Sequence, residues 1–272
     1  MAGVPAVPLR DDPSYRWESR RSALVIAHPG HELRLYHWVE RARPLVLVLT
    51  DGSGHTDHSR LASTTAVLSK ANATPGSLYG RTSDRELYEA ILAQNADFFL
   101  TLTDEIARIL HEQGIEYVVG DAVEGVNPGH DMCRLVLNAA LLRIEQTAGR
   151  RVRNFEFPVE GPPYEHSDNE SEGVRLVLDD DAYRRKLTAA KNYTELAVDL
   201  ERIVSTHGEQ MFRIEYLRPV RYGLEIGQLF EHPAIYERYG ERQVAAGLYQ
   251  EVIRFREHIS PLAKRLAPSK PQ

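Results

Sequence analysis

Two short apolar segments, Ser22–Ala27 (SALVIA) and Leu45–Thr50 (LVLVLT), constrain the fold of this chain more than any other feature. Each segment is almost continuously hydrophobic and passes directly into a polar loop. Strands buried on both faces have this composition, and they occur in parallel sheets that helices cover on both sides. A third apolar segment, Glu116–Gly120 (EYVVG), lies further along the chain. The three segments therefore predict an open α/β sheet.

Helical patterns separate these strands. The order of strand, helix, strand, helices, strand and helix is typical of a Rossmann-like, mostly parallel sheet with helices on both faces. Ser83 or Asp84 is a suitable cap for one of the helices. The expected helical segments are 33–39, 60–73, from about 84 to 94, 97–113 and 130–147. The segment Thr74-Pro75-Gly76 is expected to be a turn that closes the second of them.

The second part of the chain has a less regular pattern. It predicts strands at Asn154–Val159 and Phe212–Leu217, and one broken or two consecutive helices over Asp179–His207. A surface loop is expected at 161–173 and a long amphipathic helix at 242–265. We predict an N-terminal extension at 1–21 and a single domain at 22–272. That domain has a core at 22–150, a C-terminal α+β extension at 151–266 and a frayed tail at 267–272.

Composition narrows the functional classes. The 272 residues are 42% hydrophobic and carry a formal net charge of -6, which argues against a general phosphate-backbone binder and against docking on anionic lipid. The N-terminus lacks the apolar run of a signal peptide, and no segment approaches the length of a membrane span. We therefore expect a cytoplasmic protein with no nucleic-acid or membrane partner. Cys133 is the only cysteine, and we interpret it as a buried structural thiol.

Three histidines lie in loops that follow predicted strands. His28 and His31 follow the first strand, in A-H-P-G-H-E, and His130 follows the third strand, in V-N-P-G-H-D. The carboxyl ends of parallel strands meet at one edge, where open α/β sheets place their ligand sites. Imidazoles suit zinc, and three protein ligands are usual in catalytic zinc sites. Spacing alone leaves two interpretations open: the histidines bind one divalent metal ion, zinc or another, or each is a hydrogen-bonded or surface residue.

At these residues the chain resembles the LmbE/PIG-L family of zinc-dependent N-acetylglucosaminyl deacetylases. The family carries A-H-P-D-D-E after its first strand and H-P-D-H at the start of a later helix. The resemblance covers about residues 22–147. It implies that His28 and His130 are the first and last metal ligands and that His31 replaces a ligating aspartate. Histidine can take that place at zinc, so the resemblance implies a site of three imidazoles.

The chain departs from the family pattern at two positions. Gly30 stands where the family has its catalytic base, and losing a general base typically costs about 10²–10⁴ in rate. Asn127 stands where the family has a histidine thought to assist the tetrahedral intermediate. Asn127 can donate a hydrogen bond to an oxyanion, but it cannot act as an acid.

Other residues in the same loops are candidates for the missing base. Asp51 and Glu124 are the leading ones, because both belong to loops at the same sheet edge. Asp51 has a structural alternative, since it can simply shape its turn. The remaining candidates, each with a structural alternative, are Glu32, His55, His58, Asp121 and Asp131.

Substrate contacts are less well defined by the sequence. Arg60 and Arg81 lie near the predicted edge and can bind a hydroxyl-rich or phosphorylated ligand, although exposed surface arginines are the alternative. Aromatic residues that can line a sugar pocket, or else pack in the core, are Tyr164, Tyr222, Phe230 and Tyr236.

These observations favour a metal-dependent hydrolase that removes an N-acyl group, most simply acetyl, from an aminosugar or a glycoconjugate. The expected partner is a small-molecule or glycan substrate, and a homo-oligomer stays open. Two alternatives follow from Gly30: a metal- and carbohydrate-binding protein with little or no deacetylase activity, or a different zinc-assisted reaction on a related sugar.

Overall fold

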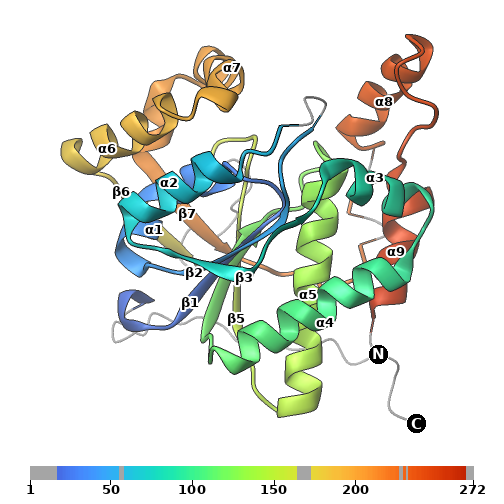
Figure 1. Ribbon diagram of the computed structural model, residues 1–272, viewed down its shortest axis with the longest axis horizontal. Coiled ribbons are helices and arrows are strands. Elements are labelled where there is room, and N and C mark those ends of the chain that lie inside the picture. Colours follow the sequence, from blue (N-terminus) through green and yellow to red (C-terminus); the bar gives the residue numbers. More distant parts are fainter. Residues whose placement is uncertain (1–16, 55–57, 164–172, 227–228, 231, 268–272) are drawn as a thin grey trace.

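The computed structural model describes residues 17–54, 58–163, 173–226, 229–230 and 232–267. It shows one seven-stranded sheet in the order β3-β2-β1-β4-β5-β7-β6 (Figure 1). The strands are β1 (Ser22–Ile26), β2 (Leu45–Thr50), β3 (Thr74–Thr82), β4 (Tyr117–Asp121), β5 (Arg153–Phe157), β6 (Val174–Val177) and β7 (Ile214–Pro219). The first five strands pair in parallel, whereas β7 is antiparallel to β5 and to β6. The predicted mostly parallel α/β fold is confirmed.

Alternate residues of the central strands face two separate cores. Ala23 and Val25 belong to one cluster of buried side chains, and Leu24 and Ile26 belong to the other. Side chains alternate along a strand, so an uninterrupted apolar strand needs helices on both sides. One core includes α3 (Asp84–Leu92), α4 (Ala96–Glu112), α5 (Pro128–Ala148) and α9 (Ser260–Leu266). The other includes α1 (Tyr36–Ala42), α2 (Leu61–Ala71) and α6 (Asp180–Lys191).

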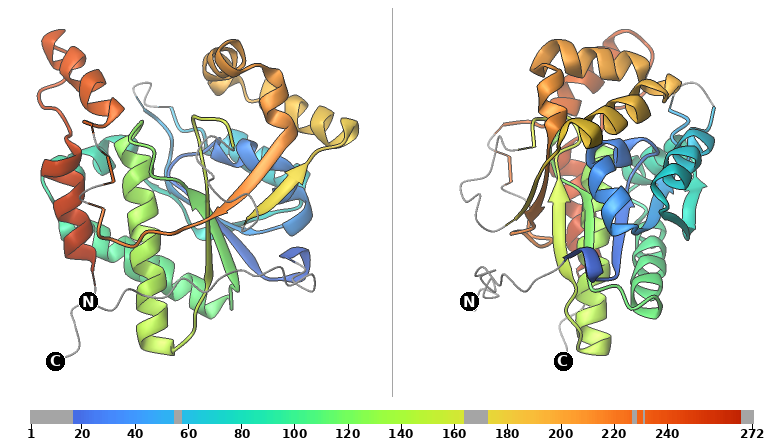
Figure 2. Two further views of the ribbon diagram at one scale, coloured as in Figure 1. Left: turned by 180° about the vertical axis from the view of Figure 1, so that it is seen from behind. Right: turned by 90° about the vertical axis from the view of Figure 1, so that its left-hand side faces the viewer.

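The remaining helices project from one end of the sheet. α7 (Ala197–His207) and α8 (Ile235–Ala245) stand apart from each other above the carboxyl ends of the parallel strands (Figures 1 and 2). Short helical turns are η1 (Trp17–Ser19), η2 (His31–Leu35), η4 (Thr194–Leu196), η5 (Glu209–Arg213) and η6 (Phe255–Ile259). In the described part of the chain, no helix is long and apolar enough to span a membrane.

The expectation of a turn at Thr74-Pro75-Gly76 was wrong, because these residues begin β3, which pairs in parallel with β2. Local sequence favours a turn here, but β3 is the edge strand of the sheet, where proline is tolerated. An added Cβ on Gly76 would lie 2.3 Å from Leu47 Cδ2. The glycine therefore allows close contact between the two strands, which sequence pattern alone does not reveal.

The single long helix expected at 242–265 was also wrong. α8 ends at Ala245, an irregular segment follows, and η6 (a π-helical turn) leads into α9. Gly247 has a φ of 72° in this break, a conformation that glycine adopts without strain. Pro261 lies in the first turn of α9, where its missing N–H costs nothing. In addition, β6 was not predicted, because its pairing partner β7 lies far away in sequence.

A buried ion pair within the C-terminal extension also contacts the N-terminal part of the chain. Lys186 of α6 donates to Glu215 of β7 at 2.8 Å, with side chains 1% and 0% exposed. Glu215 also accepts hydrogen bonds from the backbone N–H groups of His37 and Trp38, in the first turn of α1. These contacts satisfy donors that a helix start otherwise leaves unpaired. One carboxylate therefore joins an N-terminal helix to the C-terminal part of the sheet.

Candidate metal centre

The structure brings the three predicted histidines together at the carboxyl edge of the sheet. His28 follows β1, His31 opens η2, and His130 lies in the first turn of α5. The ring centroids are 5.4 Å apart for His28 and His31, 5.2 Å for His28 and His130, and 4.5 Å for His31 and His130. All three side chains are buried. We call this group the histidine cluster.

Local sequence explains why the two loops present these rings. Gly30 has a φ of 107°, a backbone conformation that glycine adopts far more readily than other residues. The turn at Gly30 brings His31 close to His28. In the second loop, Asn127 is the N-cap of α5 and Pro128 occupies the first helical position. Both residue types favour a helix start at that point. His130 is therefore held at the beginning of a well-defined helix.

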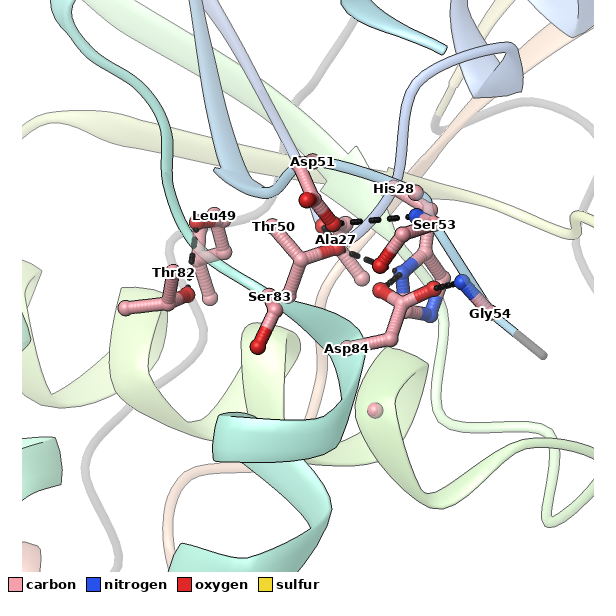
Figure 3. Close-up of polar contacts among 12 residues, drawn as sticks. Ala27, His28, Leu49, Thr50, Asp51, Ser53, Gly54, Thr82, Ser83 and Asp84 are labelled. Carbon is pink, nitrogen blue, oxygen red and sulfur yellow. Dashed lines mark hydrogen bonds and ion pairs between the residues drawn. The ribbon is translucent and has the colours of Figure 1, made fainter. Parts of the chain in front are cut away.

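Two buried aspartates hold two of the rings. The His28 Nδ1 lies 2.8 Å from Asp84 Oδ1 and 2.8 Å from Thr50 Oγ1 (Figure 3). The His31 Nδ1 lies 3.0 Å from Asp121 Oδ1. A carboxylate on one ring nitrogen fixes the tautomer and leaves the other nitrogen as a lone-pair donor, as in metal-binding histidines. Both rings are therefore oriented through Nδ1, which leaves Nε2 available.

Asp84 was not among the predicted site residues. It occupies the first turn of α3, after the N-cap Ser83, whose capping box with Glu86 is present. Burial raises the pKa of Asp84, but the hydrogen bond and charge of His28 outweigh burial and hold that pKa well below its ordinary value. The carboxylate is therefore ionised. The capping signal placed the helix start correctly, but no motif linked it to His28.

The cluster contains buried polar atoms with no hydrogen-bond partner. These atoms are His28 Nε2 and His130 Nδ1. Buried polar atoms are nearly always paired, so an unpaired imidazole nitrogen needs an explanation. Burial, followed by the charges of the neighbouring histidines and Arg60, holds the pKa of His130 well below its ordinary value. His130 is therefore neutral, the form that binds metal ions.

The spacing of the three rings suits a zinc ion, whereas the orientation of the rings does not. Imidazoles that bind one zinc ion tetrahedrally at about 2.0–2.1 Å have centroids roughly 5 Å apart, as here. However, within the described ranges no group of three or more His, Cys, Asp or Glu side chains is arranged so that it could hold a metal ion. Spacing carries more weight, because the χ2 torsion of histidine is broad and His130 Nδ1 has no partner to hold it. Three imidazole nitrogens are a donor set that suits a divalent metal ion, and whether they hold one stays a prediction.

The two leading candidates for the base make local contacts. Asp51 Oδ1 accepts the backbone N–H of Ser53 at 2.9 Å, which shapes the loop after β2 (Figure 3). Glu124 accepts the backbone N–H of Val159 at 2.7 Å. Burial raises the pKa of Glu124, and that hydrogen bond opposes the shift. Neither contact involves a ring of the histidine cluster, so both roles stay predictions.

Asn127 lies beside the cluster with its carbonyl oxygen already engaged. Oδ1 accepts the backbone N–H of Gly129 at 2.7 Å and the hydroxyl of Tyr88 at 3.2 Å. A backbone N–H can only donate, so it fixes the orientation of the amide. The Nδ2 group is therefore the donating end of Asn127. An added Cβ on Gly129 would lie 3.0 Å from both Asn127 Oδ1 and His28 Nε2, which shows how closely this loop approaches the cluster.

The two predicted arginines occupy different surroundings. Arg60 is half-buried and donates from Nε to the carbonyl of Gly52 at 2.6 Å, and its charge acts on His130. Arg81 is 61% exposed and forms an ion pair with Glu105 of α4 at 2.6 Å. Arg60 is therefore electrostatically coupled to the cluster, and the substrate role of each arginine stays a prediction.

Other candidate bases are buried and engaged. Asp131 is fully buried, and burial raises its pKa to about 8 despite hydrogen bonds from the Gly125 and Glu124 backbones. Glu32 is also fully buried; burial raises its pKa to about 7, and its carboxylate accepts the Gly30 N–H at 2.8 Å. His55 lies outside the described residues.

The end of the Leu196 side chain crowds the position of the family base in this structure. A Cβ built on Gly30 would lie 2.3 Å from Leu196 Cδ1 and 3.6 Å from Tyr193 Cζ. Real Cβ atoms do not approach other atoms that closely, so Leu196 would have to shift. Leu196 belongs to η4 of the C-terminal extension. The aspartate is absent, and the end of a side chain from another part of the chain lies beside its position.

Comparisons with known proteins show which solved structures share this fold. No family model matches the chain, and no curated protein matches its sequence. Among solved structures, the A40926 pseudoaglycone deacetylase Dbv21 is 17% identical with a TM-score of 0.51, and the match covers 76% of this chain and 99% of Dbv21.

Two structures of teicoplanin deacetylases also match, with TM-scores of 0.44. The zinc-inhibited form of the deacetylase Orf2 is 14% identical over 74% of this chain and 99% of Orf2. A deacetylase–teicoplanin complex is 15% identical over 74% of this chain and 94% of that one. By its match to Dbv21, the chain has the α/β fold of a deacetylase of the LmbE/PIG-L family, as its two histidine motifs implied.

Proposed function

We propose that this chain is a metal-dependent hydrolase that removes an N-acyl group, most simply acetyl, from an aminosugar or a glycoconjugate. The observation that carries the proposal is the histidine cluster, three buried imidazoles 4.5–5.4 Å apart, at the sheet edge where α/β folds bind ligands. The fold shared with Dbv21 supports it. His28, His31 and His130 would hold one divalent ion, zinc first among the candidates.

The surrounding residues have roles that do not depend on the identity of the metal. A bound divalent cation would polarise the acyl carbonyl and make water a nucleophile at neutral pH. Asp84 and Asp121 orient the two rings through Nδ1, which keeps their Nε2 atoms directed for binding. Asn127 Nδ2 is the donor for the oxyanion that develops on the acyl oxygen.

A carboxylate must take up a proton during hydrolysis, and Asp51 and Glu124 are the proposed candidates. Glu124→Gln and Asp51→Asn separate them, because both substitutions preserve shape and remove basicity. The variant that lacks the base should lose about 10²–10⁴ in rate, while the other stays near the wild type. Equal, small effects in both variants would exclude these residues as the base.

A second candidate function is metal and carbohydrate binding with little or no turnover. Gly30 favours it, because this position carries no acid or base, and the end of the Leu196 side chain lies beside it. This candidate predicts bound metal and sugar affinity without release of an amine.

The first experiment combines metal content and activity. Inductively coupled plasma mass spectrometry would measure metal in the wild type, His31→Ala and the control His111→Ala, an exposed histidine of α4. The same proteins would be assayed for amine release from a panel of N-acetylglucosamine compounds. Stoichiometric metal and amine release, both lost only in His31→Ala, would support the hydrolase. Metal without amine release would favour the binding protein. A wild type that binds no metal after reconstitution would refute both.

A further inference from the structure

One turn of α3 contacts both loops that carry the histidine cluster. Asp84 and Tyr88 are four residues apart in this helix, and side chains at that spacing lie on the same face of a helix. Asp84 Oδ1 lies 2.8 Å from Nδ1 of His28, in the loop after β1 (Figure 3). The Tyr88 hydroxyl lies 3.2 Å from Oδ1 of Asn127, at the start of α5. One face of α3 therefore holds a residue of each loop.

Tyr88 is the donor in its contact with Asn127. The carbonyl oxygen Oδ1 carries no hydrogen, so the hydroxyl must donate. The ring of Tyr88 packs against the apolar core between α3 and α5. Burial, followed by the charge of Asp84, raises the pKa of Tyr88 well above its ordinary value. The hydroxyl therefore keeps its proton at neutral pH and remains a donor.

Two donors fill the two acceptor positions of the Asn127 carbonyl oxygen. The backbone N–H of Gly129 donates to Oδ1 at 2.7 Å. A carbonyl oxygen has two lone pairs, so Tyr88 can engage the second one. The χ2 torsion of asparagine is broad unless contacts restrain it. Two hydrogen bonds to Oδ1 restrain the plane of the amide more firmly than one, and they leave Nδ2 as the end that donates to another group.

We propose that Tyr88 is a positioning residue, whose hydroxyl holds the Asn127 amide so that Nδ2 points at the oxyanion formed on the acyl group. The inference rests on the proposed function, which assigns Asn127 to that oxyanion. Tyr88 acts through Asn127 rather than on the substrate. A preorganised donor stabilises a transition state better than one that must rotate into place, because the reaction then requires no reorganisation. The same face of α3 orients His28 through Asp84 and the oxyanion donor through Tyr88.

The kinetics of Tyr88→Phe test this role, because the substitution removes the hydroxyl and keeps the ring. In the metal-loaded protein, kcat for amine release is expected to fall about 10-fold, with KM and metal content unchanged, since one neutral hydrogen bond is lost. Tyr183→Phe is the matched control. The Tyr183 hydroxyl donates to the carbonyl of Glu209 at 3.1 Å in a separate apolar cluster, so its loss should leave kcat unchanged. An unchanged kcat in Tyr88→Phe, or an equal fall in both variants, would overturn the assignment.

A double-mutant cycle tests whether the effect passes through Asn127. Asn127→Ser keeps a residue type that caps helices well but removes Nδ2, and it should lower kcat by about 10²–10³-fold. In that background Tyr88→Phe is expected to cause no further loss, because no amide is left to orient. A further loss of about 10-fold would show that Tyr88 acts by another route and would overturn the proposal.

Nuclear magnetic resonance of the Asn127 side-chain amide separates this inference from the proposed function. The nitrogen–proton heteronuclear NOE of Nδ2 should fall in Tyr88→Phe, because the amide then moves more freely on the picosecond to nanosecond timescale. It should not change in Tyr183→Phe. If the wild type releases no amine from any substrate, the hydrolase is refuted, and this measurement alone decides the positioning role. An unchanged NOE in Tyr88→Phe would refute that role, whether or not amine is released.

Discussion

The two parts of the molecule differ in the size of their apolar cores. In the N-terminal part, β1 and β4 are buried at every residue, and α4 and α5 bury long apolar faces. The C-terminal extension has a smaller apolar cluster around Tyr183 and Phe212, no residue of α7 is fully buried, and the buried Lys186–Glu215 pair adds a polar contact between α6 and β7. Burial of apolar surface follows the hydrophobic periodicity of the sequence and can be predicted from it. A polar contact depends on two individual residues and on their positions in space.

The same division applies to the proposed chemistry. The N-terminal part supplies the histidine cluster and both aspartates that hold it. The C-terminal extension supplies Leu196 beside Gly30 and most of the lining of a cavity of about 730 Å³ next to the loop between β4 and α5. We infer that the first part provides the reactive groups and that the second restricts what reaches them.

The largest effect is expected where the two parts meet. Lys186→Met leaves the carboxylate of Glu215 buried without its cation, which should lower the free energy of unfolding by about 3–5 kcal/mol. Lys191→Met in the same helix is the control, because its ion pair with Glu209 is 62% and 40% exposed and is expected to contribute about 0–1 kcal/mol. Urea denaturation measures both. Similar losses in the two variants would show that the buried pair contributes no more to stability than the exposed one.

Gly30→Ala tests whether the extension closes the position of the family base. The φ of 107° and the contact with Leu196 should together cost roughly 1–3 kcal/mol of unfolding free energy. Gly149→Ala is the control, since Gly149 has a φ of 60° with no atom within 4 Å of an added Cβ. In a Leu196→Ala background, the cost of Gly30→Ala should fall towards that of the control. An unchanged cost would mean that the backbone alone excludes a side chain.

Asp84→Asn tests what Asp84, which was not predicted from the sequence, contributes to metal affinity. The amide accepts through a single oxygen and carries no charge, so it holds the His28 ring less firmly. Metal affinity, measured by competition with a chelator, should fall by about 10–100-fold, equivalent to about 1.4–2.7 kcal/mol. Asp51→Asn is expected to leave metal affinity within about twofold, because its contact is with Ser53. Unaltered affinity in Asp84→Asn would separate this residue from the metal centre.

Ser83→Ala gives the smallest expected effect and lies wholly in the N-terminal part. Ser83 Oγ accepts the backbone N–H of Glu86 at 3.2 Å, so its loss should cost about 1 kcal/mol of unfolding free energy. Because Asp84 begins the same helix, metal affinity should also fall slightly. Thermal unfolding with and without zinc measures both, and a stability loss with no change in the zinc-dependent shift would show that the cap does not position Asp84.

Much of the fold could be predicted, and the failures share a cause. β1, β2 and β4 follow from uninterrupted apolar runs, and α3 follows from its Ser83 cap. The prediction for β3 failed because Pro75 and Gly76 are residues that favour turns, whereas pairing with β2 makes them part of a strand. The prediction of one helix at 242–265 failed because the apolar periodicity of the sequence continues across the break at Gly247.

The candidate site divides in the same way. His28, His31 and His130 were identified from two motifs after strands, and their meeting follows from parallel pairing of β2, β1 and β4. Asp84 was missed because its contact with His28 joins residues that no motif links. The cavity was anticipated only as aromatic residues, of which Tyr222 and Phe230 line it.

The parallel sheet, the helices with clear caps and the sheet edge at which the histidines lie could all be predicted from the amino-acid sequence. These features depend on hydrophobic periodicity and on the order of the elements, which can be read along the chain. Tertiary packing adds that Asp84 and Asp121 hold two rings, that Leu196 lies beside Gly30, and that Arg202 and Arg218 pair with Glu160 and Glu156. Each of these contacts joins residues far apart in the sequence, and its energy depends on position in space, which periodicity does not encode.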